Sequence, residues 1–219
     1  MSIIADNIKQ IRDELSSYEG RIIAVSKYVN AQKMHEAYEA GIRDFAESKA
    51  QEAITKIDTL PKEVKANCTW HFIGHLQTNK VKKVIGYFDY IHSVDSFKLA
   101  QVINDLANEK GLTQKILLQV NIADEETKFG FSSEELFEVF PKIAKLENIS
   151  VEGLMMMAPY LYDEASLASL FGKMRTLKEK FERDLKFTIK ELSMGMSNDY
   201  KVAIKEGSTM VRVGTKIFV

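Results

Sequence analysis

The chain is 219 residues long, 45% apolar and 28% charged, which is enough for one sizeable hydrophobic core but small for two. Its 30 basic and 31 acidic residues give a net charge of −1, so its charge favours neither nucleic acid nor an anionic membrane as a partner. No apolar run approaches the roughly 20 residues that a membrane-spanning helix needs. Small molecules are therefore the expected partners.

Cysteine usage and the N-terminal segment bear on the cellular compartment. The single cysteine, Cys68, cannot form an internal disulfide. Residues 1–15 carry charges where a signal peptide needs an unbroken apolar core. We therefore expect a cytoplasmic protein.

An amphipathic helix is the first predicted element. Its residues Ile4, Ile8, Ile11 and Leu15 fall on one face, so we expect this helix to cover the bottom or the side of the fold. Eight short β-rich runs follow, and several are apolar along their whole length, as strands buried on both faces are. The eight runs are 21–26, 44–48, 70–74, 90–94, 115–120, 151–157, 191–195 and 210–214.

Segments of helical periodicity separate these runs. Asp95 is predicted to cap a helix that Gly111 ends, and Ser132 with Glu135 forms a capping-box pattern. Pro141 is predicted to kink or split the next helix. A later apolar stripe, spaced at three and four, comprises Leu167, Leu170, Phe171, Met174, Leu177 and Phe181.

Eight alternations of strand and helix imply right-handed crossovers and a closed parallel sheet. The prediction is an α/β fold, a single (β/α)8 TIM-type barrel domain over residues 1–219 with an additional N-terminal helix. An open doubly wound sheet is the alternative.

Functional groups of such barrels gather at the C-terminal ends of the strands, and phosphate commonly binds after the seventh and eighth strands. Residues 193–198 (SMGMSN) and 212–215 (RVGT) supply small residues, hydroxyls and backbone N–H groups there. Together they favour a bound phosphate. The alternative is that Gly195 and Gly214 only turn the chain.

Lys27 directly follows the first run. At the mouth of a barrel, with its stem among apolar neighbours, partial burial would favour the neutral amine that attacks an aldehyde to form a Schiff base. Most lysines at strand ends are simply exposed, so Lys27 alone decides nothing.

Five segments, in order along the chain, resemble the pyridoxal phosphate homeostasis protein family. They are AVSK (24–27), HFIGHLQTNK (71–80), GLMMMAP (153–159), LSMGMS (192–197) and GSTMVRVGTKIF (207–218). The resemblance implies a barrel similar to the N-terminal domain of alanine racemase, with pyridoxal 5′-phosphate as its cofactor. It also implies a role in the balance of that cofactor rather than in a defined turnover reaction.

Taken position by position, the resemblance implies that Lys27 holds the cofactor covalently, as an internal aldimine, and that Arg212 faces its pyridine nitrogen. The residues that match the phosphate-binding cup are Ser197, Gly214 and Thr215. Two methionines lie beside this cup, Met194 and Met196.

The second strand departs from the family, which typically reads Gly-Glu-Asn where this chain has Ala46-Glu47-Ser48. Ser48 is shorter than asparagine, and this puts a contact from that strand to the cofactor in doubt. His75 is predicted to line the site, where it could hydrogen-bond the cofactor, although a satisfied loop histidine is equally plausible.

Three further features of the sequence bear on the site. Lys128 could accept the cofactor as a second imine during release, although a solvated loop lysine is the simpler interpretation. His71 and His75 have the spacing of a metal pair, but that spacing joins ligands on a helix and His71 lies in a strand, so no metal is expected. The methionines at 155–157, 194 and 196 are interpreted as barrel packing.

An arginine opposite the pyridine nitrogen opposes its protonation and weakens the cofactor as an electron sink. By the resemblance, alanine racemase tolerates such an arginine, but it also uses a tyrosine base that a second domain supplies across a dimer. This chain ends at Val219, four residues after Thr215, so we expect no such domain and a monomer.

The favoured function is a non-enzymatic carrier that holds pyridoxal phosphate reversibly and delivers it, with apo-enzymes as the partners that this role implies. One alternative is a pyridoxal-phosphate enzyme, such as a weak amino-acid racemase of the alanine racemase type or a decarboxylase. Another is a Schiff-base aldolase for a phosphorylated sugar. Its lysine would lie on a central strand, commonly the sixth, where this chain has methionines.

Overall fold

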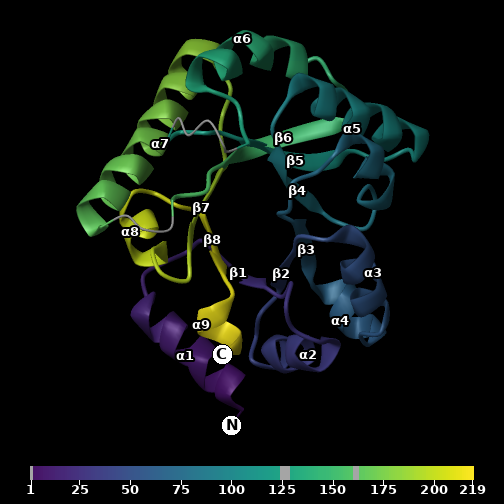
Figure 1. The fold of residues 1–219 in the computed structure, drawn as a ribbon, viewed down its shortest axis with the longest axis vertical. Coiled ribbons are helices and arrows are strands. Elements are labelled where there is room, and N and C mark those ends of the chain that lie inside the picture. The colour runs from purple at the N-terminus through teal and green to yellow at the C-terminus, as the bar shows by residue number, and fades with distance from the viewer. Residues whose placement is uncertain (1, 124–128, 160–162) are drawn as a thin grey trace.

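A computed structural model describes residues 2–123, 129–159 and 163–219, and its parallel strands form a closed barrel (Figure 1). Each strand pairs with the next one along the chain, and the barrel closes where β1 pairs with β8, for example at Ile23 beside Arg212. This closure excludes the open doubly wound sheet. The strands are β1 (Arg21–Val25), β2 (Asp44–Glu47), β3 (Thr69–Phe72), β4 (Tyr90–Val94), β5 (Gln114–Gln119), β6 (Ile149–Met155), β7 (Glu191–Met196) and β8 (Met210–Val213).

Helices surround the barrel (Figure 1). They are α1 (Ile3–Glu14), α2 (Ala31–Glu39), α3 (Ala50–Asp58), α4 (Lys62–Asn67), α5 (Phe97–Glu109), α6 (Ser133–Ile143), α7 (Glu164–Leu185), α8 (Tyr200–Lys205) and α9 (Thr215–Phe218). A 3-10 helix, η1 (Thr78–Lys83), lies between β3 and β4. The prediction of a (β/α)8 barrel with an additional N-terminal helix is confirmed, and every predicted strand agrees with the observed one to within two residues at each end.

The helix boundaries test the predicted caps. Ser132 Oγ accepts a hydrogen bond from the backbone N–H of Glu135 at 3.1 Å, as predicted, and Gly111 follows α5 with a φ of +63°. The predicted cap at Asp95 is wrong, because the N-cap of α5 is Ser96. Pro141 does not split α6, which ends soon after it.

The N-terminal helix packs its predicted face against the barrel. Ile4, Ile8 and Ile11 are buried, whereas Leu15 is half-buried at the helix end. The Asn7 side chain donates to two backbone carbonyl oxygens at the C-terminal end of the chain, at 3.1 and 3.2 Å. Figure 1 accordingly shows α1 beside α9 at one side of the barrel. The predicted apolar stripe of α7 is buried as well.

Among the residues that the structure describes, the hydrophobic core has two parts. The larger part fills the space between strands and helices, and the smaller part lies inside the barrel, formed by Ile23, Ala46, Tyr90, Leu117, Met155 and Met210. Toward the N-terminal ends of the strands the interior becomes charged, with Arg21 Nη1 3.2 Å from Asp44 Oδ1. Among the described residues, none of the helices is both long and apolar enough to cross a membrane.

Candidate functional site

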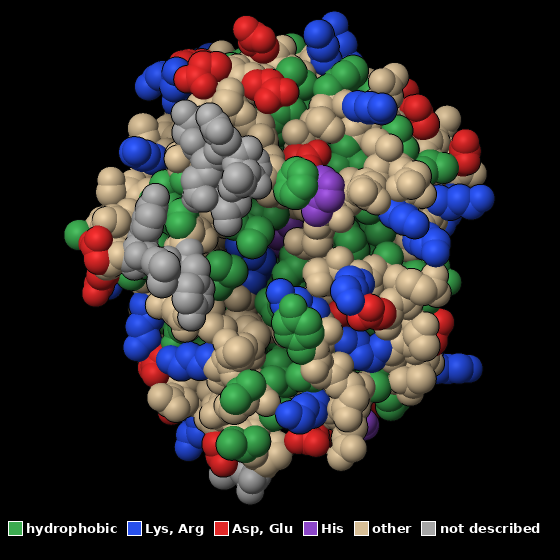
Figure 2. All heavy atoms as spheres, in the orientation of Figure 1, with side chains coloured by type: hydrophobic (Ala, Val, Ile, Leu, Met, Phe, Trp, Pro, Cys, Tyr) green, Lys and Arg blue, Asp and Glu red, His purple; other side chains and the backbone are tan. Residues whose placement is uncertain are grey.

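The C-terminal ends of the strands carry the predicted site. Side chains of a strand alternate between its two faces, so the inward-facing Ile23 and Val25 of β1 lead to Lys27, and the inward-facing Ala46 of β2 leads to Ser48. Figure 2 shows a hollow over the centre of the barrel, bordered by hydrophobic, basic and histidine side chains. The fold therefore brings residues far apart in the sequence to one rim.

Lys27 lies in the turn after β1 and is exposed. Its Nζ lies 5.0 Å from the ring centre of Tyr28, which is also exposed. The predicted partial burial of Lys27 is therefore wrong, because this residue lies beyond the last residue of β1 that pairs with a neighbouring strand. Its amine is open to a ligand that enters from solvent.

A buried ion pair anchors the backbone on both sides of Lys27. Glu47 Oε1 lies 2.5 Å from Lys56 Nζ and accepts from Ser26 Oγ at 2.6 Å. Lys56 Nζ also donates to the backbone oxygens of Ser26 and Val29, at 2.7 and 3.1 Å. Sequence analysis missed this cluster, although a glutamate facing outward from a buried strand was the available signal.

The loops after β7 and β8 are joined by one hydrogen bond. Ser197 Oγ accepts from the backbone N–H of Gly214 at 3.1 Å. Burial raises the pKa of the nearby Asp199, whose carboxylate accepts from the backbone N–H of Met196. Thr215 is exposed at the start of α9. A hydroxyl, a glycine and an exposed threonine thus lie at adjoining strand ends.

Two residues of this region have structural roles. Gly195 has a φ of +91°, and a Cβ there would lie 2.6 Å from the side chain of Ala203, so only glycine fits the turn. The Met194 side chain is fully buried in the larger core. That side chain faces the helices, so a contact of Met194 with the cofactor stays a prediction for its backbone.

Arg212 of β8 is buried at 4% exposure. Its guanidinium donates to Ser193 Oγ at 2.5 Å and to the backbone oxygen of Met156 at 2.8 Å, and among the described residues it forms no ion pair. Burial lowers the pKa of Arg212 to about 10, and the charge of Asp199 partly offsets that effect. A buried cation without a direct carboxylate partner suits a ligand with an acceptor or a negative charge.

His75 and Ser48 complete the predicted set. His75 Nδ1 lies 3.3 Å from Asp95 Oδ2, and its ring stacks on Phe129 with centroids 3.7 Å apart. Ser48 is half-buried, its hydroxyl makes no hydrogen bond within the described part of the chain, and its backbone packs against Gly74. Lys128 lies outside the described residues. Within those residues, no three histidine, cysteine or acidic side chains are grouped to hold a metal ion.

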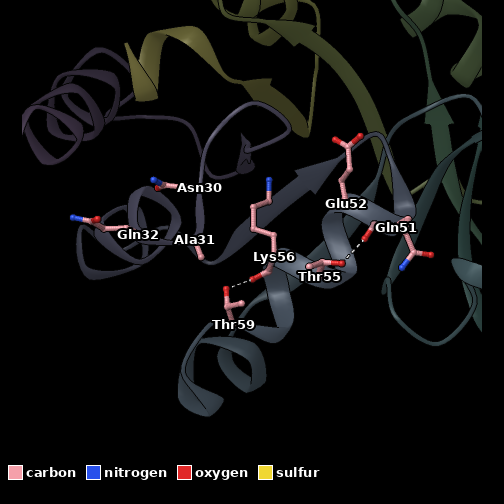
Figure 3. Close-up of a pocket in the computed structure, with 8 residues that line it drawn as sticks. All are labelled: Asn30, Ala31, Gln32, Gln51, Glu52, Thr55, Lys56 and Thr59. Carbon is pink, nitrogen blue, oxygen red and sulfur yellow. Dashed lines mark hydrogen bonds between the residues drawn. The ribbon is translucent and has the colours of Figure 1, made fainter.

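A groove of about 680 Å³ lies outside the barrel, between the start of α2 and helix α3 (Figure 3). It is lined by Asn30, Ala31, Gln32, Gln51, Glu52, Thr55, Lys56 and Thr59. None of the predicted cofactor residues is among them. Lys56, which lines the groove, is also the cation of the ion pair with Glu47.

Comparison with known proteins places this architecture in a family. A family model described as the N-terminal domain of alanine racemase matches residues 1–219. The pyridoxal phosphate homeostasis protein of Aquifex aeolicus is 39% identical over 198 residues, which cover 90% of this chain and 86% of that protein. The one of Escherichia coli K12 is 37% identical over 231 residues, covering 100% and 97%. The chain belongs to the pyridoxal phosphate homeostasis protein family. The resemblance seen in the sequence is thereby confirmed.

Solved structures agree with this membership in the pyridoxal phosphate homeostasis protein family. PipY of Synechococcus elongatus without PLP has a TM-score of 0.92 at 37% identity, covering 99% of this chain and 100% of PipY. PipY with PLP bound has a TM-score of 0.89. An alanine racemase of Clostridium difficile has a TM-score of 0.76 at 17% identity, and the match covers 98% of this chain but 57% of the racemase. That likeness shows the fold alone.

Proposed function

We propose that this protein binds pyridoxal 5′-phosphate at the C-terminal rim of the barrel and serves as a carrier in the homeostasis of that cofactor. The observation that carries the proposal is the exposed amine of Lys27 on the same rim as the buried Arg212 and the joined Ser197 and Gly214 loops. The structure of PipY with PLP bound, 37% identical over almost the whole chain, supports it.

The residues of the rim fit the three functional groups of this cofactor. Lys27 Nζ would bond covalently to the aldehyde carbon, with release of one water. Ser197 and Thr215 would hold the phosphate through their hydroxyl donors, and the backbone N–H of Gly214 would join them once it is released from Ser197 Oγ. The Arg212 guanidinium would face the ring nitrogen. When bound, the cofactor supplies an electrophilic carbon and a conjugated ring that accepts electrons.

Ser48 and His75 occupy the rim on the β2 and β3 sides. Both side chains have hydrogen-bonding atoms, and we propose that they contact the ring substituents or a ligand amine. Met194, whose side chain is in the core, would contact the cofactor through its backbone. The serine at position 48 reaches less far than the asparagine of the family, which favours a water-mediated contact on that side.

The electrostatics favour storage over turnover. With a pKa of about 10, the Arg212 guanidinium stays charged at neutral pH and opposes protonation of a ring nitrogen beside it. That weakens the stabilisation of a carbanion, which racemisation and decarboxylation need. We propose a non-enzymatic, cytoplasmic, monomeric carrier with one domain over residues 1–219 and with apo-enzymes as recipients.

Absorption spectroscopy tests this function. Purified protein mixed with pyridoxal phosphate should develop the visible band of an imine, and Lys27→Ala should lack it. Lys49→Ala is the matched control, because Lys49 is an exposed lysine at the same rim, paired with the exposed Glu52. An added amino acid should not be consumed. Steady conversion of that amino acid would establish the weak racemase or decarboxylase instead, and a wild type without a band would refute cofactor binding through Lys27.

A further inference from the structure

A chain of hydrogen bonds runs through the barrel interior and ends on Arg212. Asp44 Oδ1 lies 3.0 Å from His71 Nε2, and His71 Nδ1 lies 2.9 Å from His92 Nε2. His92 Nδ1 lies 3.0 Å from Ser193 Oγ, which accepts from Arg212 at 2.5 Å. The chain joins β2, β3, β4, β7 and β8. Both imidazoles are fully buried, so each of their ring nitrogens needs a hydrogen-bond partner.

Burial favours the neutral form of both imidazoles in this chain of hydrogen bonds. The two rings face each other through ring nitrogens 2.9 Å apart, so at least one of those nitrogens carries a lone pair. Burial lowers the pKa of His71, although Asp44 partly opposes the effect. Burial, followed by the charges of His71, Arg212 and Arg21, lowers the pKa of His92 well below its usual value. A second proton on either ring is therefore disfavoured at neutral pH.

The two ends of the chain then fix the direction of every bond. The Asp44 carboxylate can only accept, so His71 donates through Nε2 and, being neutral, accepts at Nδ1. His92 must donate to it through Nε2 and therefore accepts at Nδ1. The Ser193 hydroxyl donates to that nitrogen and accepts from the guanidinium, which can only donate. Each of the four hydrogen bonds is therefore donated in the direction that leads from Arg212 toward Asp44.

We infer that Asp44, whose Oδ1 also lies 3.2 Å from Arg21 Nη1, fixes the donor direction that orients the Arg212 guanidinium, acting through His71, His92 and Ser193 as positioning residues. The inference rests on the proposed function in one respect: the guanidinium that the chain orients is the group that would meet the cofactor ring. With Ser193 on one side and the backbone oxygen of Met156 on the other, the plane of the guanidinium is set before any ligand arrives.

The tautomers of His71 and His92 test the chain of hydrogen bonds in protein that carries no cofactor. Long-range proton–nitrogen NMR spectra of the cofactor-free wild type should show both His71 and His92 neutral, with the proton on Nε2. The guanidinium protons of Arg212 should exchange slowly, and Ser193→Ala, a small change, should make them exchange at least about tenfold faster. An Nδ1 proton on His92, an imidazolium at His71, or unchanged exchange in Ser193→Ala would overturn the inference.

Cofactor affinity tests the consequence. His92→Phe and Ser193→Ala should each bind pyridoxal phosphate about tenfold more weakly, the loss expected when a charge-assisted hydrogen bond is released. Asp44→Asn keeps the acceptor but removes the charge, so its loss should be smaller than that of Asp44→Ala. His35→Ala is the matched control, because His35 is a half-exposed histidine on the surface of α2.

The outcomes separate the two claims. A wild type that does not bind pyridoxal phosphate refutes the proposed function, and the tautomers and the Arg212 exchange rates then still decide whether the chain exists. A folded Ser193→Ala that binds with wild-type affinity refutes the positioning role while leaving the carrier function intact. Circular dichroism identifies a variant that fails to fold. For such a variant, the NMR spectra of the wild type decide whether the chain of hydrogen bonds exists.

Discussion

The buried pair of Glu47 and Lys56 should control the stability of the segment that carries Lys27. In Glu47→Gln the shape is kept and the charge is lost, so the Lys56 ammonium, 14% exposed, is left without its counter-ion. Breaking a buried pair by removing one partner typically costs about 3–5 kcal/mol. Because Lys56 keeps its two bonds to backbone oxygens of the β1–α2 segment, we expect the lower end, about 3 kcal/mol.

Thermal and urea unfolding measure this loss. For a chain of this size about 3 kcal/mol corresponds to a fall in Tm of about 6–12 °C. The matched control is Glu52→Gln, which breaks the ion pair with Lys49 at 2.8 Å between side chains that are 62% and 69% exposed. A surface pair of this kind contributes about 0–1 kcal/mol, so the control should unfold within a few degrees of the wild type.

A double variant separates charge from packing. Glu47→Leu combined with Lys56→Met removes both charges and loses the two hydrogen bonds of Lys56 to backbone oxygens, about 2 kcal/mol together. Ser26 Oγ loses Glu47 as its acceptor but keeps the backbone oxygen of Ala46 at 3.3 Å. It should therefore be more stable than Glu47→Gln alone. A Glu47→Gln protein within about 1 kcal/mol of the wild type, or a double variant less stable than the single one, would refute the argument.

Three further predictions concern other parts of the barrel. The pKa values of His71 and His92 are lowered in the folded protein, so the unfolded chain takes up protons first as the pH falls. Urea unfolding should show the full free energy of unfolding above about pH 7 and a loss of about 1 kcal/mol per histidine by pH 5.5. A free energy of unfolding that does not change with pH would contradict the burial of both rings in the neutral form. Gly195→Ala would place a Cβ 2.6 Å from the side chain of Ala203 in α8 and should cost at least about 2 kcal/mol in the same assay. Gly111→Ala, at a φ of +63° but in open space, should cost about 1 kcal/mol. Equal losses for the two variants would show that only the positive φ matters. Burial raises the pKa of Cys68 to about 11, so alkylation at pH 8 should be at least about tenfold slower in the native than in the urea-unfolded protein, and equal rates would show that the thiol is accessible.

Periodicity was sufficient to predict the barrel because the signal repeats eight times and each repeat is supported by its neighbours. The strand runs, the buried face of α1 and the stripe of α7 all follow from which side chains avoid water. Local capping was harder. Asp95 and Ser96 are both good N-caps by residue type, and the choice between them depends on His75, which draws the Asp95 carboxylate toward the rim.

The candidate site could be predicted only in part. Ser197 and Gly214 were placed together correctly because their positions at strand ends follow from the barrel itself. The exposure of Lys27 depends on where β1 stops pairing, and the burial of Met194 depends on which face of β7 it occupies. A one-residue difference reverses either outcome, and strand ends are not predicted to that accuracy.

The interior hydrogen bonds escaped sequence analysis for a different reason, since they join five strands and no local pattern spans them. The available signal was polar residues at inward positions of buried strands, as in His71 and Ser193. Such residues are costly inside a barrel unless they are paired. Their presence predicts partners across the barrel without saying which residues these are.

Strand β2 connects the two systems that flank the proposed cofactor. Its inward side chain Asp44 begins the chain to Arg212, and its outward side chain Glu47 holds the segment of Lys27. Because alternate residues of a strand face opposite sides, the pairing of β2 with β1 sets both at once. A change that displaces β2 should therefore weaken the covalent and the electrostatic contacts of the cofactor together. Substitutions at Glu47 or Asp44 alone should separate them, since each acts on one face.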